Sequence, residues 1–144
     1  MPNFSGSCLC GEIKFAVNGP IGSLVHCHCS RCRKWHGSAY RSRVVVRVSD
    51  FTWLQGKSAL SYYESTPNVT KTFCSKCGSN LITIYQKKPD IYGVPVGGLE
   101  GDFGQPESFH VFVGSKAAWH KITDELEQFE ELPHDSERIH RICI

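Results

Sequence analysis

The sequence contains eight cysteines, and seven of them fall into three closely spaced groups. The groups are C-x-C at Cys8 and Cys10, C-x-C-x-x-C at Cys27, Cys29 and Cys32, and C-x-x-C at Cys74 and Cys77. Cysteines two positions apart are poor disulfide partners, because their side chains diverge on a strand. Metal binding or thiol chemistry therefore explains this spacing better than a disulfide framework does. Cys143 stands alone, and the sequence gives it no role.

The first and third groups share one feature, a glycine directly after the last cysteine. These glycines, Gly11 and Gly78, permit the positive φ that the tight turn of a zinc knuckle often requires. Two such turns supply four thiolates, which close a tetrahedral structural zinc site. The chain between them is far longer than the roughly 15 to 20 residues of an ordinary four-cysteine ribbon, so most of a sheet must interrupt it. The alternative is that Cys8 and Cys10 are buried small hydrophobic residues.

The middle group places three cysteines within six residues, close enough to bind one ion from a single loop. Three protein ligands and an exchangeable fourth position are typical of a catalytic zinc, whereas four protein ligands are typical of a structural one. His28 or His36 could complete a closed site. The spacing alone leaves the open site, the closed site and other pairings of the cysteine groups as possibilities. Arg31, Arg33 and Lys34 would favour thiolates here, although they could also be ordinary surface residues.

Length and composition indicate a protein of one domain that spans no membrane. The 144 residues carry 16 Lys and Arg against 14 Asp and Glu, a net charge of +2 without a run of like charges. This balance predicts neither a nucleic-acid partner nor a membrane partner. No apolar stretch approaches the roughly 18 residues of a membrane span, and the first residues resemble no secretory signal. We therefore expect a soluble, cytoplasmic protein in a reducing compartment.

Hydrophobic periodicity predicts a mainly β fold. In residues 11–17, Ile13, Phe15 and Val17 alternate with polar or small residues, as in a half-buried strand. Residues 40–48 place valines on one face and arginines on the other, so we expect one core face and one solvated or functional face. Further strands are predicted, between turn-forming residues, at 59–63, 70–73, 81–85, 91–96 and 109–113.

Little helix is expected in this chain. Single turns are predicted at 31–36 and 115–119, and a short acidic helix at 124–132. Residues 134–144 are interpreted as a polar C-terminal tail that follows a single domain over residues 5–133. His110, flanked by apolar residues of a predicted strand, is expected to be a histidine whose hydrogen bonds are satisfied within the sheet.

The order of the motifs resembles one known family. The motifs are Gly6-Ser7-Cys8-Leu9-Cys10-Gly11, then Cys27-His28-Cys29-Ser30-Arg31-Cys32-Arg33-Lys34 with Gly37, then Phe73-Cys74-Ser75-Lys76-Cys77-Gly78-Ser79, and finally Pro106 to Phe112 and Ala117-Ala118-Trp119. Together they are similar to the glutathione-dependent formaldehyde-activating enzymes, a family that includes centromere protein V. Seven cysteines in the family's order make the resemblance far more specific than a single C-x-x-C.

The resemblance implies a single-domain antiparallel β fold of zinc-ribbon ancestry, of the β-tent or Mss4-like kind. It implies two Zn²⁺ per chain, a structural ion on Cys8, Cys10, Cys74 and Cys77 and a catalytic ion on Cys27, Cys29 and Cys32. It also implies a carbon–sulfur lyase that resembles S-(hydroxymethyl)glutathione synthase. In that reaction the glutathione thiolate adds to formaldehyde at the open three-cysteine zinc, whose sulfur ligands suit a soft thiolate.

Glutathione is anionic, so its carboxylates require cations. The substrate-binding candidates are Arg33, Lys34, Lys71 and the arginine face of residues 40–48. Thr70 stands where the family often has arginine, so a bidentate carboxylate contact is not expected there. His26, His28 and His36 are candidates for orienting the cysteine loop or moving a proton.

Two other functions are compatible with these residues. One is a zinc enzyme of the same family that acts on another thiol or another small electrophile. The other is a non-catalytic zinc module for protein or chromatin binding. The second predicts a basic extension or a basic face, but the sequence after residue 123 is acidic. The sequence predicts no oligomeric state.

Overall fold

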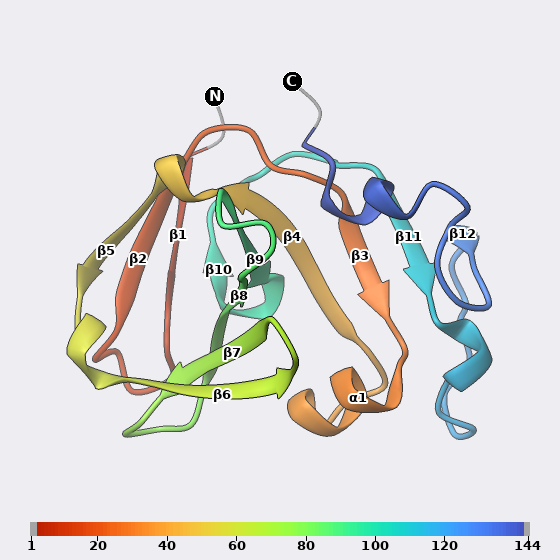
Figure 1. Cartoon of the computed structure of the whole chain (residues 1–144), viewed down its shortest axis with the longest axis horizontal. Coiled ribbons are helices and arrows are strands. Elements are labelled where there is room, and N and C mark those ends of the chain that lie inside the picture. The colour runs from red at the N-terminus through yellow and green to blue at the C-terminus, as the bar shows by residue number, and fades with distance from the viewer. Residues whose placement is uncertain (1–2, 143–144) are drawn as a thin grey trace.

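Two β-sheets and one short helix make up the computed structural model, which describes residues 3–142 (Figure 1). The mainly β prediction is confirmed, and each of the seven predicted strands has a counterpart. The three longer strands that the sequence analysis missed are β1, β3 and β5. Cys143 lies outside the described residues.

The smaller sheet is antiparallel. Its strand order is β10 (Leu99–Glu100), β1 (Asn3–Ser7), β2 (Lys14–Asn18) and β5 (Phe51–Gln55). Phe15 and Val17 of β2 are buried while Lys14 is exposed, as the alternation predicts. β1 ends directly before Cys8, so this sheet delivers the first cysteine pair.

The larger sheet is antiparallel except at one edge. Its order is β12 (Glu127–Gln128), β11 (Ser108–Val111), β3 (Leu24–Cys27), β4 (Arg41–Arg47), β9 (Ile91–Pro95), β8 (Asn80–Tyr85), β7 (Val69–Cys74) and β6 (Leu60–Thr66). β11 runs parallel to both of its neighbours, β3 and β12. This sheet delivers the other two cysteine groups, at the ends of β3 and β7.

The main core lies between the two sheets. Phe4, Phe15 and Val17 of the smaller sheet form one buried cluster with Val44 and Val46 of the larger sheet. Burial of large apolar side chains is worth about 1.5 to 3 kcal/mol each. This core therefore fixes the relation between the two sheets that carry the cysteines.

Strand β4 corrects one expectation. Val44 and Val46 are buried as predicted, but Arg41 and Arg43 on the other face are also buried, with 5% and 4% exposure. Two parts of the chain cover that face. One is Thr83 on β8, two strands away in the sheet, and the other is the C-terminal segment, which packs over the face. Arg41 donates to Thr83 Oγ1 at 2.7 Å and Arg43 to the Ile139 carbonyl at 2.7 Å. The arginine face is therefore not a solvated surface.

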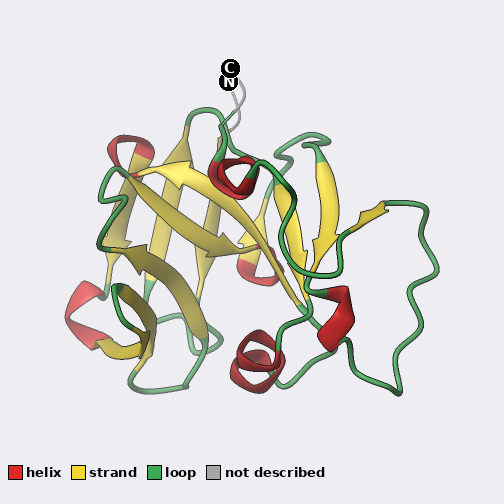
Figure 2. Cartoon of the chain, turned by 45° about the vertical axis from the view of Figure 1, so that its right-hand side comes forward, coloured by secondary structure: helices red, strands yellow, loops and turns green. Residues whose placement is uncertain are grey.

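The principal helix, α1 (Ser30–His36), follows β3 directly and lies at the end of β3 and β4 (Figure 1). Cys29 caps its N-terminus, and Gly37 ends it with a φ of 59°. The remaining helical segments are short 3₁₀ turns, so strand dominates the chain (Figure 2). Within residues 3–142, no helix is long and apolar enough to cross a membrane.

The acidic helix predicted at 124–132 is wrong. This stretch contains the two-residue strand β12, which pairs with β11, and Phe129 N donates to the His110 carbonyl at 3.0 Å. The helical turn predicted at 115–119 is also wrong, since a 3₁₀ turn ends at Ser115 (Val113–Ser115). At 124–132 the pairing with a distant strand overrides local propensity.

Residues 134–142 pack against the larger sheet. Their 3₁₀ turn (Ser136–His140) places Ile139 against Arg43, and the His140 ring lies 4.9 Å from that of Tyr85. Arg138 lies over Phe109 at 4.5 Å from the ring centre. The segment therefore covers the face of β4 and β8 that carries the buried arginines.

Candidate metal centres

The first and third cysteine groups meet at the junction of the two sheets. Cys8 and Cys10 follow β1, while Cys74 ends β7 and Cys77 lies in the turn after it. All four sulfurs lie within 4.8 Å of one another. We call this set the four-cysteine cluster.

Both turns of this cluster have the backbone that the sequence predicts. Gly11 has a φ of 80° and Gly78 a φ of 76°. Gly11 N donates to the Cys8 carbonyl at 3.1 Å, and Gly78 N donates to the Cys74 carbonyl at 2.8 Å. A side chain at either glycine would be strained in this conformation, so the glycines shape the two turns.

The spacing of the sulfurs fits a tetrahedral metal ion. Metal–sulfur bonds of ~2.3 Å place the sulfurs of a tetrahedral zinc site ~3.8 Å apart. Here Cys8 and Cys10 Sγ are 3.6 Å apart, and Cys10 and Cys74 Sγ are 3.9 Å apart. Ile13 N donates to Cys8 Sγ at 3.3 Å, a hydrogen bond that stabilises thiolate. The donor set therefore fits zinc.

The second group forms a separate three-cysteine cluster from one short segment. Cys27 ends β3, Cys29 caps α1, and Cys32 is buried in the first turn of the helix. Their sulfurs also lie within 4.8 Å of one another. The cap brings Cys29 and Cys32 together, since Cys32 N donates to Cys29 Sγ at 3.4 Å. Hydrogen bonding with the sulfurs of Cys27 and Cys32 lowers the pKa of Cys29.

Neither candidate histidine joins this cluster as a fourth donor. Among the described residues, the metal-ligand group here contains the three cysteines alone. One ring nitrogen of His28 pairs with His110, and one of His36 pairs with Asn80 at 3.1 Å. The geometry thus supplies three sulfur donors, and residues 3–142 supply no fourth ligand.

A group of buried cations lies beside the three-cysteine cluster: Arg41, Arg43 and Lys71. Among residues 3–142 no aspartate or glutamate forms an ion pair with any of them. Burial raises the pKa of Tyr85, but the charges of Arg43 and Arg41 outweigh it and lower that pKa to about 8. The thiol of Cys32 is close enough to Arg41 for their charges to interact. These cations therefore offset the negative charge of the thiolates.

Buried histidines lie on the other side of the cluster. His28 is fully buried between Cys27 and Cys29, and its Nε2 is 2.8 Å from Nδ1 of His110. His110 Nε2 lies 3.0 Å from Asp124 Oδ2. Burial raises the pKa of Asp124, but the His110 hydrogen bond and the Leu126 amide lower it overall. An ionised carboxylate only accepts, so His110 Nε2 donates to Asp124. In the neutral His110 ring Nδ1 is then the acceptor, and His28 donates to it from Nε2. His28 Nδ1 is left as a buried acceptor without a partner among the described residues.

The other two candidate histidines are also part of this environment. His26 pairs with Ser42 Oγ at 2.7 Å and with Ser108 Oγ at 3.1 Å. Burial lowers the pKa of His26, His28 and His36 to about 4 in each case. All three rings are therefore neutral near pH 7, and His26 bridges β4 and β11 on either side of β3.

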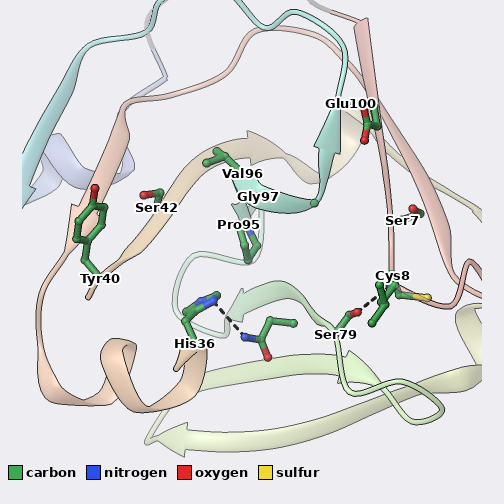
Figure 3. A pocket seen from close by; sticks show the side chains of 13 residues that line it. Ser7, Cys8, His36, Tyr40, Ser42, Ser79, Pro95, Val96, Gly97 and Glu100 are labelled. Carbon is green, nitrogen blue, oxygen red and sulfur yellow. Dashed lines mark hydrogen bonds between the residues drawn. The ribbon is translucent and has the colours of Figure 1, made fainter. Parts of the chain in front are cut away.

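A pocket of about 730 Å³ lies beside the four-cysteine cluster, whose Cys8 lines it (Figure 3). His36, Tyr40 and Ser42 line one side, and Cys8 and Ser79 line the other. Its charged lining residue is Glu100, so this pocket offers no cation to an anionic ligand.

A second pocket, of about 400 Å³, lies on the other side of α1 and has the opposite charge. Its lining residues are Arg31, Lys34, Trp35, Tyr63, Ser65 and Lys71. We call it the cationic pocket. Two sequence candidates, Lys34 and Lys71, meet here. The third, Arg33, does not line it, and its Nε donates to the His28 carbonyl at 3.4 Å.

Two residues of the site, Tyr85 and Asp124, were missed by sequence reasoning. Arg41 and Arg43 were candidates only as part of the arginine face, and their burial was not expected. Tyr85 and Asp124 lie far from the C-x-C-x-x-C segment in the sequence, so their positions give no signal. An arginine-bearing strand that follows closely after the C-x-C-x-x-C segment was the one available hint.

Comparison with known proteins agrees with this geometry. The sequence model of the glutathione-dependent formaldehyde-activating enzymes matches residues 3–115, which contain all seven clustered cysteines. A Halomonas elongata protein with the provisional name of glutathione-dependent formaldehyde-activating enzyme is 27% identical over 124 residues, covering 81% of this chain and 79% of its own length.

Two further similarities extend this result. A Schizosaccharomyces pombe protein named as an uncharacterized lyase is 28% identical over 92 residues, covering 64% of this chain and 65% of its own. A crystal structure of a Rhodobacter sphaeroides protein matches with a TM-score of 0.55 and 27% identity, covering 68% of this chain and 89% of that one. The family match therefore rests on the sequence, and a solved structure shares the fold.

Proposed function

The chain belongs to the glutathione-dependent formaldehyde-activating enzyme family, and from this premise we propose that it is a carbon–sulfur lyase acting on glutathione and formaldehyde. The forward reaction forms S-(hydroxymethyl)glutathione. The glutathione sulfur bonds to the carbonyl carbon, the thiol proton leaves, and the carbonyl oxygen takes up a proton. The observation that carries the proposal is the three-cysteine cluster, which has three sulfur donors, no fourth protein ligand among residues 3–142, and uncompensated cations beside it.

We assign one zinc ion to each cysteine cluster, two per chain. The four-cysteine cluster fills a tetrahedral site by itself, which is the arrangement of structural zinc. The three-cysteine cluster would leave one position for the substrate. A thiol bound to zinc at these three cysteines would have a lowered pKa and would be a thiolate at neutral pH. The reducing cytoplasm that we propose as the location keeps the ligand thiols free, and the seven described cysteines are all unpaired.

The protein contributes an oriented proton acceptor. Asp124 and His110 fix the ring of His28, and this leaves the lone pair of His28 Nδ1 unpaired. His28 also lies between two of the cysteines, so holding its ring holds the loop. We assign His28 Nδ1 as the transient acceptor of the thiol proton, because a ring with a pKa of about 4 does not retain it near pH 7. His110 and Asp124 are positioning residues.

The cationic pocket supplies the charge that glutathione requires. Arg31 and Lys34 are exposed at its rim on the helix that carries Cys29 and Cys32. Cations on this helix can hold the carboxylates of a thiol whose sulfur reaches the cluster. A neutral thiol would not use these charges, which favours glutathione over small uncharged thiols.

Zinc stoichiometry with glutathione titration tests this proposal. The wild-type protein is expected to hold two zinc ions, and Cys29→Ala about one with its fold kept, because only the three-cysteine cluster is lost. Glutathione should perturb the visible spectrum of the cobalt-substituted wild type but not that of Cys29→Ala. Ser30→Ala, a change at the next and exposed position, is the matched control and should behave as wild type.

Three results would contradict the proposal. A single zinc ion in the wild type would refute the two-site assignment. A cobalt spectrum that glutathione leaves unchanged would refute thiol binding at the three-cysteine cluster. A wild-type rate equal to that of the spontaneous addition of glutathione to formaldehyde would refute the reaction.

A further inference from the structure

Lys71 has an unusual position for a lysine. It lies in the interior of β7 with 8% of its surface exposed. Its Nζ donates to Thr83 Oγ1 at 3.4 Å and lies 4.9 Å from the ring centre of Trp35. Lysines are rarely buried without a carboxylate partner, and no described aspartate or glutamate pairs with this one.

The groups that face Lys71 from the neighbouring elements, together with burial, make its ammonium form less stable than that of an exposed lysine. They are Arg41 and Arg43 on β4, Thr83 and Tyr85 on β8, and Trp35 and Cys32 on α1. Burial and the charge of Arg41 lower the pKa of Lys71 to about 8, although Tyr85 and Cys32 act in the opposite direction. Burial beside another cation is a known way to turn a lysine into an amine nucleophile.

Lys71 is also reachable by a small molecule. It lines the cationic pocket together with Trp35, Tyr63 and Ser65. The two exposed cations of that pocket, Arg31 and Lys34, remain available for carboxylates. The pocket thus combines a buried amine with exposed charges beside the helix that carries Cys29 and Cys32.

We propose that Lys71 Nζ is a nucleophile that captures a small aldehyde as a reversible Schiff base within the cationic pocket. The aldehyde class of the ligand rests on the proposed function, whereas the amine and its pocket are features of the structure. The captured aldehyde is held next to the thiol site. Capture therefore raises the local concentration of the electrophile.

The chemical steps balance without another reactant. The Nζ lone pair attacks the carbonyl carbon, and a proton moves from nitrogen to oxygen to give the carbinolamine. Loss of hydroxide with one proton, as water, leaves the C=N bond of the Schiff base. Release reverses these steps. Water adds to the carbon of the C=N bond, a proton returns to nitrogen, and the C–N bond breaks. The free aldehyde is then attacked by the thiolate.

Reductive trapping tests the inference in the zinc-loaded protein without glutathione. Limiting formaldehyde with cyanoborohydride converts a Schiff base to methyl-lysine, which peptide mass spectrometry assigns to a position. Near pH 7 we expect Lys71 to be labelled at least about tenfold faster than the exposed Lys14, since a typical lysine has a pKa of about 10.4 and is almost fully protonated there. The excess should shrink as the pH approaches about 10.

Variants separate this site from general lysine reactivity. Lys71→Arg keeps a cation but cannot form the Schiff base, so the fast-labelled position should disappear while two zinc ions remain bound. Lys14→Arg is the matched control and should retain the fast label at Lys71. Labelling of Lys71 no faster than that of Lys14 would overturn the inference.

The two proposals fail in different ways. A wild-type protein that accelerates thiol addition but shows no fast label at Lys71 refutes aldehyde capture alone. A fast label at Lys71 in a protein that never accelerates thiol addition refutes the proposed reaction and leaves aldehyde capture standing.

Discussion

The two cysteine clusters use the same donor atom in opposite settings. The four-cysteine cluster joins segments that lie 64 positions apart, between Cys10 and Cys74, and links the two sheets. The three-cysteine cluster comes from one strand end and one helix turn. The first can constrain the whole fold, whereas the second can constrain only its own loop.

Their charge environments differ as well. Around the four-cysteine cluster the partners are backbone amides and Ser79, whose hydroxyl lowers the pKa of Cys77 to about 5. The ion pair of Lys76 with Glu12 lies on the surface beside it. The three-cysteine cluster has buried arginines on one side and buried histidines on the other. The difference teaches that ligand number and the surrounding charge, rather than ligand type, separate a structural site from a reactive one.

Removal of one ligand from each cluster should show this difference most strongly. In Cys74→Ser we expect the loss of one zinc ion and of several kcal/mol of unfolding free energy, because a metal that closes so long a loop is worth about 4 kcal/mol of chain entropy by analogy with a disulfide. In Cys32→Ser we also expect the loss of one zinc ion, but a smaller loss of stability. Urea unfolding with zinc analysis measures both effects. Equal destabilisation by the two variants would contradict the comparison.

Much of the four-cysteine cluster was predictable from sequence because its requirements are local. A glycine after the last cysteine shapes each turn, and the observed φ values of Gly11 and Gly78 agree with that expectation. The strands were predictable for a similar reason, since period-two burial is a property of a strand and its own face.

The surroundings of the three-cysteine cluster were not predictable in the same way. Arg41 and Arg43 have the sequence pattern of a solvated strand face, and only the C-terminal segment and β8 bury them. The pairing of His110 with His28 depends on β11 running parallel to β3. Such contacts depend on which distant strands become neighbours in the sheet. The residue pattern within one segment does not determine that pairing.

The buried cations provide a second way to sharpen the comparison. In Arg41→Met we expect zinc affinity at the three-cysteine cluster to fall by about 10 to 100-fold, as when partners around a metal site are removed. The four-cysteine cluster should keep its affinity. Chelator competition with cobalt spectra distinguishes the two sites.

Arg47→Met is the matched control for this experiment, because Arg47 lies at the far end of the same strand from Arg41. Arg41→Lys should recover part of the affinity, since it restores a charge. An equal loss at both clusters would indicate a general effect on the fold and would refute an electrostatic role for Arg41.

The histidine side of the cluster should give the smallest effect of the three. In Asp124→Asn the amide no longer fixes the proton of His110, so the lone pair of His28 Nδ1 is not held in one tautomer. We expect the rate of thiol addition to fall by about tenfold while two zinc ions stay bound and stability changes little, because Asp124 is half-exposed. A thiol whose pKa is lower than that of glutathione needs the acceptor less, so it should show a smaller rate loss in the variant. The same loss for both thiols would mean that Asp124 only supports the loop, whereas a loss that grows with thiol pKa identifies the acceptor.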